Sequence, residues 1–232
     1  MLTLFLIRPT SLPSLPVVLS PEMYTLLQRA TFAILDQAGL PTSCGFFVTP
    51  CGVALTAAHD AEKWLRKKGK KHVVRASSYI NEEFELEVLK RQVGKLDIAV
   101  LRLPGPVSAQ PCLPLPATTF TAQQLSGAPV KLIHGSIAWN QESGASNFAE
   151  YNGSIITSNA TKIHYNVGTF KGHSGAALLL RGEQVIGLHS MGFNDMPQEM
   201  SEQSPSTAAD AERLDVPAVK QAVLQFMKAK TA

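Results

Sequence analysis

The sequence predicts an all-β protein made of two six-stranded antiparallel barrels packed together, with a short N-terminal helix and a C-terminal helix. Short apolar runs broken by turn residues recur along most of the chain, which is the pattern of strands. Residues 104–116 contain five prolines and divide these runs into two series. Of the 232 residues, 45% are hydrophobic and 17% charged, which is the composition of a globular protein with a large core.

The N-terminal segment, residues 1–30, is predicted to be irregular at first and to end in a short helix. Ser20 is placed to cap that helix, with Pro21 in its first turn. The apolar stretch that opens the chain is short and is followed by Arg8, whereas a secretory signal has its positive charge before a longer apolar run. Since no stretch approaches the ~18 apolar residues of a membrane span, we expect neither a signal peptide nor a membrane partner.

The two strand series predict the two barrels. Residues 31–103 form the first barrel, residues 104–118 an extended proline-rich linker, and residues 119–197 the second barrel. In the first barrel the expected strands are 31–36, 44–49, 52–57, 72–76, 84–91 and 98–103. In the second barrel they are 129–138, 149–156, 161–165, 176–180 and 184–190, with a sixth near 120–125.

Residues 198–232 are predicted to form a polar loop, over 198–210, and then the C-terminal helix. Asp215 is a suitable N-cap for this helix. The helix has an apolar face that should dock on the barrels, and its members are Val219, Val223, Phe226 and Met227.

A glycine-flanked serine is the strongest functional signal, Ser174 in Gly172-His173-Ser174-Gly175. Serine is a weak nucleophile at neutral pH, and it needs a base to take its proton and a carboxylate to orient that base. His59 and Asp97, which lie beside predicted strands, are the candidates. The order His, Asp, Ser excludes an α/β-hydrolase, in which the serine comes first. Each residue alone also has an ordinary structural interpretation, but together they predict a nucleophilic serine site.

These motifs resemble those of the chymotrypsin-like (trypsin-fold) serine endopeptidases, over roughly residues 31–195 and in the same order. The matching segments are 44–59, 97–103, 172–175 and 187–192. The resemblance implies that His59 and Asp97 come from one barrel and Ser174 from the other, so that the site lies at their seam. It also implies an acyl-enzyme mechanism, with an oxyanion hole formed by the backbone amides of Gly172 and Ser174.

His173 departs from the pattern of the secreted members of that family. Those enzymes have an aspartate before the serine, and it pairs with a new N-terminus after zymogen cleavage. A histidine cannot form that pair, so we expect no activation of this kind. We also expect the His173 side chain to point away from that of Ser174.

The specificity pocket is predicted from Thr169, His189 and Gly192. Gly168 stands six residues before Ser174, where a trypsin-like pocket has its acid, so a basic residue before the scissile bond (P1) finds no carboxylate. Thr169 and His189 are similar to the pair that binds a P1 glutamine or glutamate in the processing proteases of picornaviruses and sobemoviruses. A neutral imidazole and a hydroxyl can each donate to such a side chain. The alternative is that His189 is an ordinary strand residue satisfied by the backbone.

Three cysteines, Cys44, Cys51 and Cys112, are too few and too unevenly placed for a disulfide framework. In secreted family members a cysteine after the catalytic histidine bridges to the Cys44 position, but here Asp60 follows His59. Reduced thiols are favoured over a Cys44–Cys51 bridge. They indicate a reducing compartment and therefore an intracellular, cytoplasmic protein.

The basic run from Lys63 to His72 is the main charge feature. It is either a solvated loop, which we favour, or a weak RNA-binding surface. The net charge of +3 is too small to indicate a nucleic-acid partner by itself. The dispersed histidines and cysteines fit no metal motif, and no phosphate-binding loop occurs, so no cofactor is expected.

The sequence thus predicts a serine endopeptidase that acts on a polypeptide substrate, through a His-Asp-Ser triad and an acyl-enzyme, and cleaves after glutamine or glutamate. One alternative is a catalytically silent trypsin-fold module that binds partners. Another is a cellular housekeeping or stress protease of the same fold with a different P1 preference.

Overall fold

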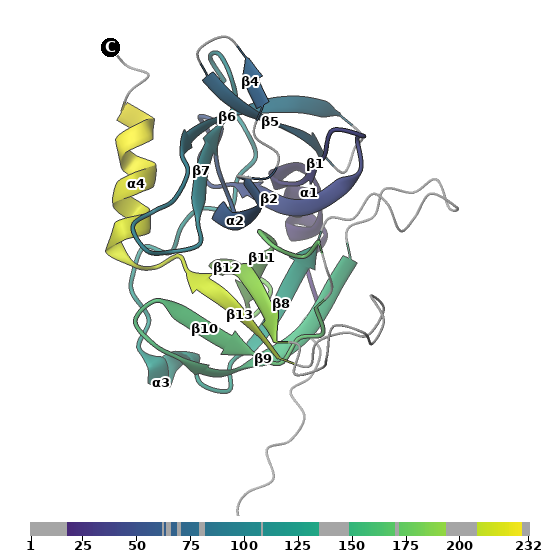
Figure 1. Ribbon diagram of the computed structural model, residues 1–232. Coiled ribbons are helices and arrows are strands. Elements are labelled where there is room, and N and C mark those ends of the chain that lie inside the picture. The colour runs from purple at the N-terminus through teal and green to yellow at the C-terminus, as the bar shows by residue number, and fades with distance from the viewer. Residues whose placement is uncertain are drawn as a thin grey trace, which may run out of the picture.

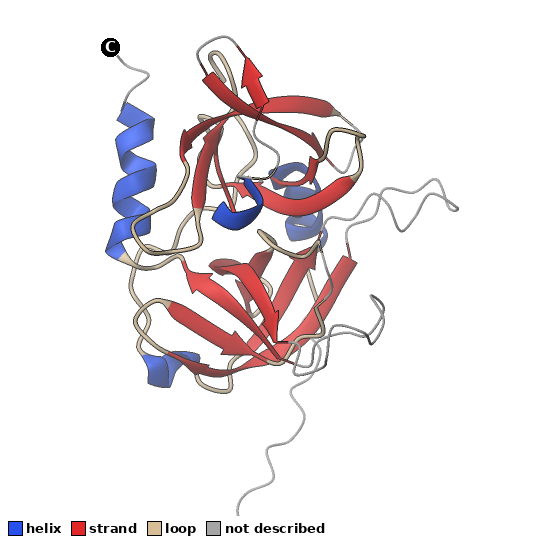
Figure 2. Ribbon diagram, in the orientation of Figure 1, coloured by secondary structure: helices blue, strands red, loops and turns tan. Residues whose placement is uncertain are grey.

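The computed structural model describes residues 18–61, 63, 66–68, 71–78, 82–107, 109–134, 149–169, 172–193 and 208–228. Figure 1 shows the strands gathered into two bodies, with β1 to β7 in one and β8 to β13 in the other. Figure 2 shows that both bodies are built of strands, with helices at their margins. No helix in the described part of the chain has the length and apolar character that crossing a membrane requires.

The first barrel closes through six strands and carries a seventh at its edge. Its strands are β1 (Thr31–Leu35), β2 (Pro41–Phe47), β3 (Val53–Thr56), β4 (Arg66–Lys68), β5 (Lys71–Ser78), β6 (Glu83–Lys90) and β7 (Ala99–Arg102). The order is β1-β2-β3-β7-β6-β5-β4, and β1 also pairs with β5, which closes the ring. All these pairs are antiparallel. Strand β4 lies in the basic run, so that part of the run is a hairpin with β5 and the expected loop is wrong there.

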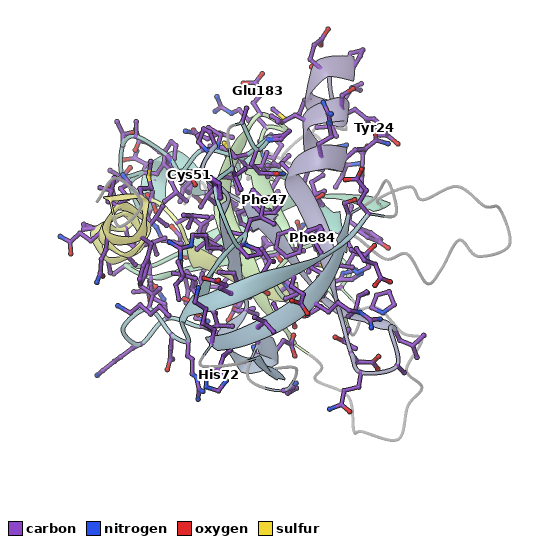
Figure 3. The ribbon with its side chains drawn as sticks, turned by 90° about the horizontal axis from the view of Figure 1, so that it is seen from above. Tyr24, Phe47, Cys51, His72, Phe84 and Glu183 are labelled. Carbon is purple, nitrogen blue, oxygen red and sulfur yellow. The ribbon has the colours of Figure 1, made fainter. Side chains whose placement is uncertain are left out.

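The interior of this barrel is aromatic. The rings of Phe32, Phe47 and Phe84 contact one another with centroids 5.1 to 5.9 Å apart. Figure 3, which looks down on the molecule, places Phe47 and Phe84 toward its middle and His72 near its rim. Gly45 pairs with Phe32 across β2 and β1, and a Cβ at Gly45 would lie 2.4 Å from the Phe32 ring. Glycine is therefore required there for the ring to lie flat on the strand.

The second barrel is a closed ring of six strands in the order β10-β13-β12-β11-β8-β9. These are β8 (Pro129–His134), β9 (Ala149–Ser158), β10 (Lys162–Tyr165), β11 (Ala177–Leu180), β12 (Gln184–Phe193) and β13 (Ala208–Arg213). The two six-stranded antiparallel barrels confirm the predicted fold class. Residues 135–138, expected to extend β8, lie outside the described residues.

The expected strand at 120–125 is wrong, because that segment contains the helix α3 (Ala122–Leu125). Thr121 and Gln124 form a reciprocal capping box, a local helix signal that outweighs the strand pattern. The sixth strand is instead β13, which the sequence analysis had assigned in part to a polar loop over 198–210. Residues 208–210 belong to this strand, whereas 198–207 lie outside the described residues.

The helix α1 (Pro21–Ala30) begins as predicted, with the Ser20 hydroxyl accepting a hydrogen bond from the Met23 amide at 3.1 Å. The short helix α2 (Ala58–Ala61) follows β3. The C-terminal helix α4 (Pro217–Lys228) is also present, and Val219 and Val223 on its apolar face are buried. Phe226 packs beside them, while Met227 is 36% exposed at the edge of that face.

The predicted capping role of Asp215 is wrong. Its carboxylate accepts hydrogen bonds from the Phe120 amide at 2.7 Å and from Arg213 Nε at 2.9 Å. Arg213 also donates to the carbonyl oxygens of Phe120 and Asn159. Asp215 therefore connects the segment that enters the second barrel to the end of β13. Because its carboxylate accepts these hydrogen bonds, it does not cap the C-terminal helix.

A single apolar cluster joins the two barrels and α4. It contains Leu55 and Val100 from the first barrel, Ile133 and Leu188 from the second, and Val219 from the helix. Packing of this kind fixes the two halves relative to each other, because close-packed interiors transmit displacement. Any site at the seam is therefore held by a continuous core.

Candidate active site

Ser174 lies in a tight turn that both barrels hold. Its carbonyl oxygen accepts the Cys44 amide of β2 at 2.7 Å, and the next amide, that of Gly175, donates to the His189 carbonyl of β12 at 2.8 Å. Gly175 has φ +82°, and a Cβ there would lie 2.0 Å from the Cys44 carbonyl oxygen. Only glycine allows the turn to approach β2 this closely.

His59 and Asp97 lie together at the edge of the first barrel. The Asp97 carboxylate accepts two hydrogen bonds from His59, one from its amide at 2.9 Å and one involving Nδ1 at 2.5 Å. His59 belongs to α2, directly after β3, and Asp97 immediately precedes the edge of β7. The acid thus fixes both the main chain and the ring of the histidine.

The structure brings all three predicted residues together. His59 Nε2 lies 3.2 Å from Ser174 Oγ, while Nδ1 faces Asp97. With its Nδ1 hydrogen donated to the carboxylate, a neutral His59 ring presents a lone pair on Nε2 to the serine hydroxyl. This is the arrangement in which a histidine can accept the serine proton.

Asp97 is itself held from the second barrel. Its amide donates to Glu212 Oε1 of β13 at 3.1 Å, and Lys162 Nζ of β10 lies 2.6 Å from the same oxygen. Burial opposes ionisation of the Asp97 carboxyl, but the hydrogen bonds from His59 outweigh it and lower the pKa of Asp97, with the Lys162 charge adding to the effect. Sequence reasoning missed Glu212 because β13 has the composition of a polar segment, and it missed Lys162 because the partner of this lysine is Glu212.

A second carboxylate, Asp60, also contacts the His59 ring. Its Oδ2 lies 3.2 Å from Nε2, and its Oδ1 accepts a hydrogen bond from Lys63 Nζ at 2.9 Å. Asp60 first and Asp97 second raise the pKa of His59 to about 9, against the opposing effect of burial. In the sequence analysis Asp60 entered only as the residue that replaces a cysteine.

Gly172, two residues before Ser174, has φ +99°. Its carbonyl oxygen accepts the Cys44 thiol, with Sγ 3.3 Å away, and a hydrogen bond from the His134 ring. These contacts orient the peptide group that leads into the nucleophile turn.

His173 is buried against other aromatic rings. Its ring centroid lies 3.8 Å from that of His134 and 5.2 Å from that of Tyr151. Burial lowers the pKa of His173 to about 4 and holds the pKa of His134 well below its ordinary value. At neutral pH, a pair of uncharged rings therefore packs together next to Ser174.

His189 forms a buried hydrogen bond with Tyr165. Its Nδ1 lies 2.6 Å from the tyrosine Oη, and both side chains are buried. Burial lowers the pKa of His189 to about 3 and raises that of Tyr165 well above its ordinary value, so both groups are neutral near pH 7. The amide of His189 donates to the Ala176 carbonyl at 2.9 Å, which ties this part of β12 to the nucleophile turn.

Thr169 and Gly192 flank this region. Thr169 is 4% exposed, and its hydroxyl is a buried side-chain oxygen without a hydrogen-bond partner in the described structure. Gly192 pairs with Ala209 of β13 near the end of β12. Among the described residues, no backbone hydrogen bond ties Thr169 or Gly192 to the nucleophile turn, unlike His189.

The cysteines Cys44, Cys51 and Cys112 are free, so the alternative Cys44–Cys51 bridge is absent. In the part of the basic run that the structure describes, Lys63 pairs with Asp60 and Lys71 with Glu87. The described residues contain no group of three histidine, cysteine or acidic side chains that could hold a metal ion.

Two closed antiparallel barrels, with a histidine and an acid from one facing a serine from the other, define a chymotrypsin-like fold. Among solved structures, the chain is similar to the serine protease of a human pathogenic astrovirus, with a TM-score of 0.55 and 19% sequence identity. The match covers 81% of this chain and 91% of the astrovirus chain. No protein-family model matches the sequence, and no curated protein does.

Proposed function

We propose that this protein is a serine endopeptidase in which His59, Asp97 and Ser174 form a catalytic triad. The observation that carries the proposal is the hydrogen-bonded chain from Asp97 through both nitrogens of His59 to Ser174, which crosses the seam between the barrels. Alignment of three such groups is needed for general-base activation of a serine. The astrovirus structure, which is described as a serine protease, supports the same conclusion through the shared fold.

In the proposed reaction, His59 Nε2 takes the proton of Ser174 as Oγ attacks the peptide carbonyl carbon. Asp97 keeps the ring in the required tautomer and stabilises the imidazolium that forms. The same proton then passes to the leaving amine, which departs and leaves an acyl-enzyme on Ser174. His59 then takes a proton from water, which adds to the acyl group. The bond between the acyl carbon and Ser174 Oγ breaks, Oγ receives that proton from His59, and the carboxylic acid is released.

The backbone amides of Gly172 and Ser174 are the proposed oxyanion hole. Two hydrogen bonds to the Gly172 carbonyl and one to the Ser174 carbonyl restrain this turn. Donors that are already oriented need no reorganisation as negative charge develops on the carbonyl oxygen. The buried His134 and His173 rings support the turn without an N-terminal ion pair, so we expect activity without N-terminal cleavage.

The proposed P1 preference is glutamine or glutamate. A protonated Tyr165 that donates to His189 Nδ1 leaves the other ring hydrogen on Nε2. The ring also forms a hydrogen bond with the backbone of Asp210, so a substrate oxygen would have to replace that acceptor. Thr169 offers a second buried hydroxyl whose hydrogen-bonding capacity is unused. An apolar P1 side chain would leave such donors unpaired, which costs about 1–3 kcal/mol for each group.

The test is digestion of a peptide library by the purified full-length protein, with cleavage sites read by mass spectrometry. We expect cleavage after Gln or Glu, and loss of turnover in Ser174→Ala with an unchanged circular dichroism spectrum. Preference for Arg, Lys or Phe at P1 would refute the specificity and leave the triad standing. Absence of any cleavage by the folded wild-type protein would favour the catalytically silent interaction module.

A further inference from the structure

The Nε2 atom of His59 has two oxygen neighbours at the same distance. Ser174 Oγ and Asp60 Oδ2 each lie 3.2 Å away, on the nitrogen that has to accept the serine proton. A hydroxyl can donate to or accept from a ring nitrogen, but an ionised carboxylate can only accept. Since Nδ1 already faces Asp97, the contact with Asp60 is favourable only when His59 carries hydrogens on both nitrogens.

Asp60 is held in this position by its surroundings. It is 6% exposed, and its other carboxylate oxygen accepts a hydrogen bond from Lys63. A backbone hydrogen bond joins the same two residues, since the Lys63 amide donates to the Asp60 carbonyl at 3.1 Å. Burial opposes ionisation of Asp60, but the hydrogen bonds from His59 and Lys63 prevail and lower its pKa, so a fixed negative charge faces Nε2 near neutral pH.

We propose that Asp60 is a second carboxylate partner of the catalytic histidine, which accepts the Nε2 hydrogen of protonated His59 in competition with Ser174. This inference rests on the proposed function, because it concerns the base of that reaction. In the resting protein the imidazolium is bridged between Asp97 and Asp60. Only molecules whose His59 has lost the Nε2 proton can activate Ser174, so the rate rises as the pH is raised above neutrality.

Other charged groups near the His59 ring also affect its protonation. Asp97 holds the Nδ1 hydrogen, and Lys162 and Glu212 lie behind Asp97 with opposite charges. His189 is neutral near pH 7, and the charge of His59 contributes to lowering its pKa. The positive charge of Lys63 partly offsets the negative charge of Asp60. It therefore weakens the interaction between the Asp60 carboxylate and the Nε2 hydrogen of His59. Removal of Asp60 and removal of Lys63 should therefore shift the protonation of His59 in opposite directions.

The direct test is an NMR titration of the His59 ring, carried out in the Ser174→Ala background so that it does not depend on turnover. We expect a midpoint near pH 9 with Asp60 present. Asp60→Asn, which keeps the size of the side chain and removes its charge, should lower the midpoint toward the ordinary value of 6.5. Lys63→Met should raise it, and Lys71→Met, which removes a lysine that pairs with Glu87, should leave it unchanged.

The kinetic test is the rate of Ser174 labelling by a fluorophosphonate, measured from pH 6 to pH 10 in proteins that retain Ser174. While the midpoint lies well above pH 7, each unit by which it falls raises the neutral fraction of His59 at pH 7 about tenfold. Asp60→Asn should therefore label faster than wild type at pH 7, and the two rates should converge at pH 10. A change in maximal rate without a change in the pH profile would indicate a merely structural role and overturn the proposal.

The outcomes separate the two proposals. An unchanged titration midpoint in Asp60→Asn refutes the role of Asp60, even if wild-type Ser174 is labelled. Failure of wild-type labelling at every pH refutes the protease function, while the titration still decides whether Asp60 holds the Nε2 hydrogen. If Asp60→Asn does not fold, Lys63→Met decides, since an unchanged or lower midpoint in that variant contradicts the proposal.

Discussion

The two barrels share a topology but differ in what they bury. The first has an aromatic interior around Phe32 and Phe47, whereas the second contains most of the buried ionisable side chains, including His134, His189 and Arg213. Buried ionisable groups cost free energy unless they are paired, so their concentration in one barrel needs a reason. Under the proposed function, the first barrel would mainly support His59 and Asp97, while the second would position Ser174 and contact the substrate.

The largest expected effect comes from the acid in the first barrel. Asp97→Asn keeps the shape of the side chain but allows the wrong histidine tautomer, so kcat should fall roughly 10³- to 10⁴-fold. Peptide turnover at saturating substrate measures this, with thermal unfolding as the control for folding. A loss of less than tenfold in a folded variant would mean that Asp97 does not orient His59.

The next effect tests the buried ion pair of the second barrel. Arg213→Met leaves the Asp215 carboxylate buried with one fewer partner, and should lower the free energy of unfolding by about 3–5 kcal/mol. Urea unfolding measures the change. The control is Lys71→Met, which removes an exposed lysine and leaves Glu87 paired with Arg102, and which we expect to cost under about 1 kcal/mol. Equal small losses in both variants would remove the distinction between a buried and an exposed cation.

A smaller effect is expected on substrate selection. Tyr165→Phe removes the hydroxyl that holds His189 Nδ1, at a cost of about 1–3 kcal/mol in the discrimination between P1 glutamine and an apolar residue. The ratio of kcat/KM values for two matched peptides should fall by roughly tenfold, with kcat for the better peptide less affected. An unchanged ratio would separate His189 from P1 recognition.

The smallest effect concerns the contact between the barrels at Glu212. Glu212→Gln can still accept the Asp97 amide hydrogen but loses its charge pair with Lys162. We expect kcat to fall by a few fold with KM unchanged, and Lys162→Met to add little once Glu212 is replaced. Fully additive losses in the double variant would contradict action through a shared contact.

The fold and the three central residues could be predicted because their signals are local. Ser174 lies in a glycine turn, and His59 and Asp97 lie beside apolar strands, so each residue carries its context in neighbouring sequence. Strand β13 was missed because Glu212 and Arg213 are buried by virtue of partners elsewhere in the chain. A polar strand of this kind looks like a loop until its partners are known.

Long-range pairing also explains the other errors. Asp215 reads as a helix cap, but Phe120, 95 residues away, uses its carboxylate. In the sequence Asp60 is only the residue that follows His59, and its contact with Nε2 is seen in the three-dimensional arrangement alone. Local sequence indicates the helix, strand or turn to which a side chain belongs. Its hydrogen-bond partner depends on which distant segments fold against it.

The central claim is that folding aligns His59 and Asp97 of one barrel with a reactive Ser174 of the other. Peptide mapping by mass spectrometry, after treatment of the full-length protein with a fluorophosphonate at pH 9, tests it most directly. We predict one adduct, on Ser174, which is lost in His59→Ala while the fold is retained. An adduct on another residue, or none on the folded wild-type protein, would contradict the claim.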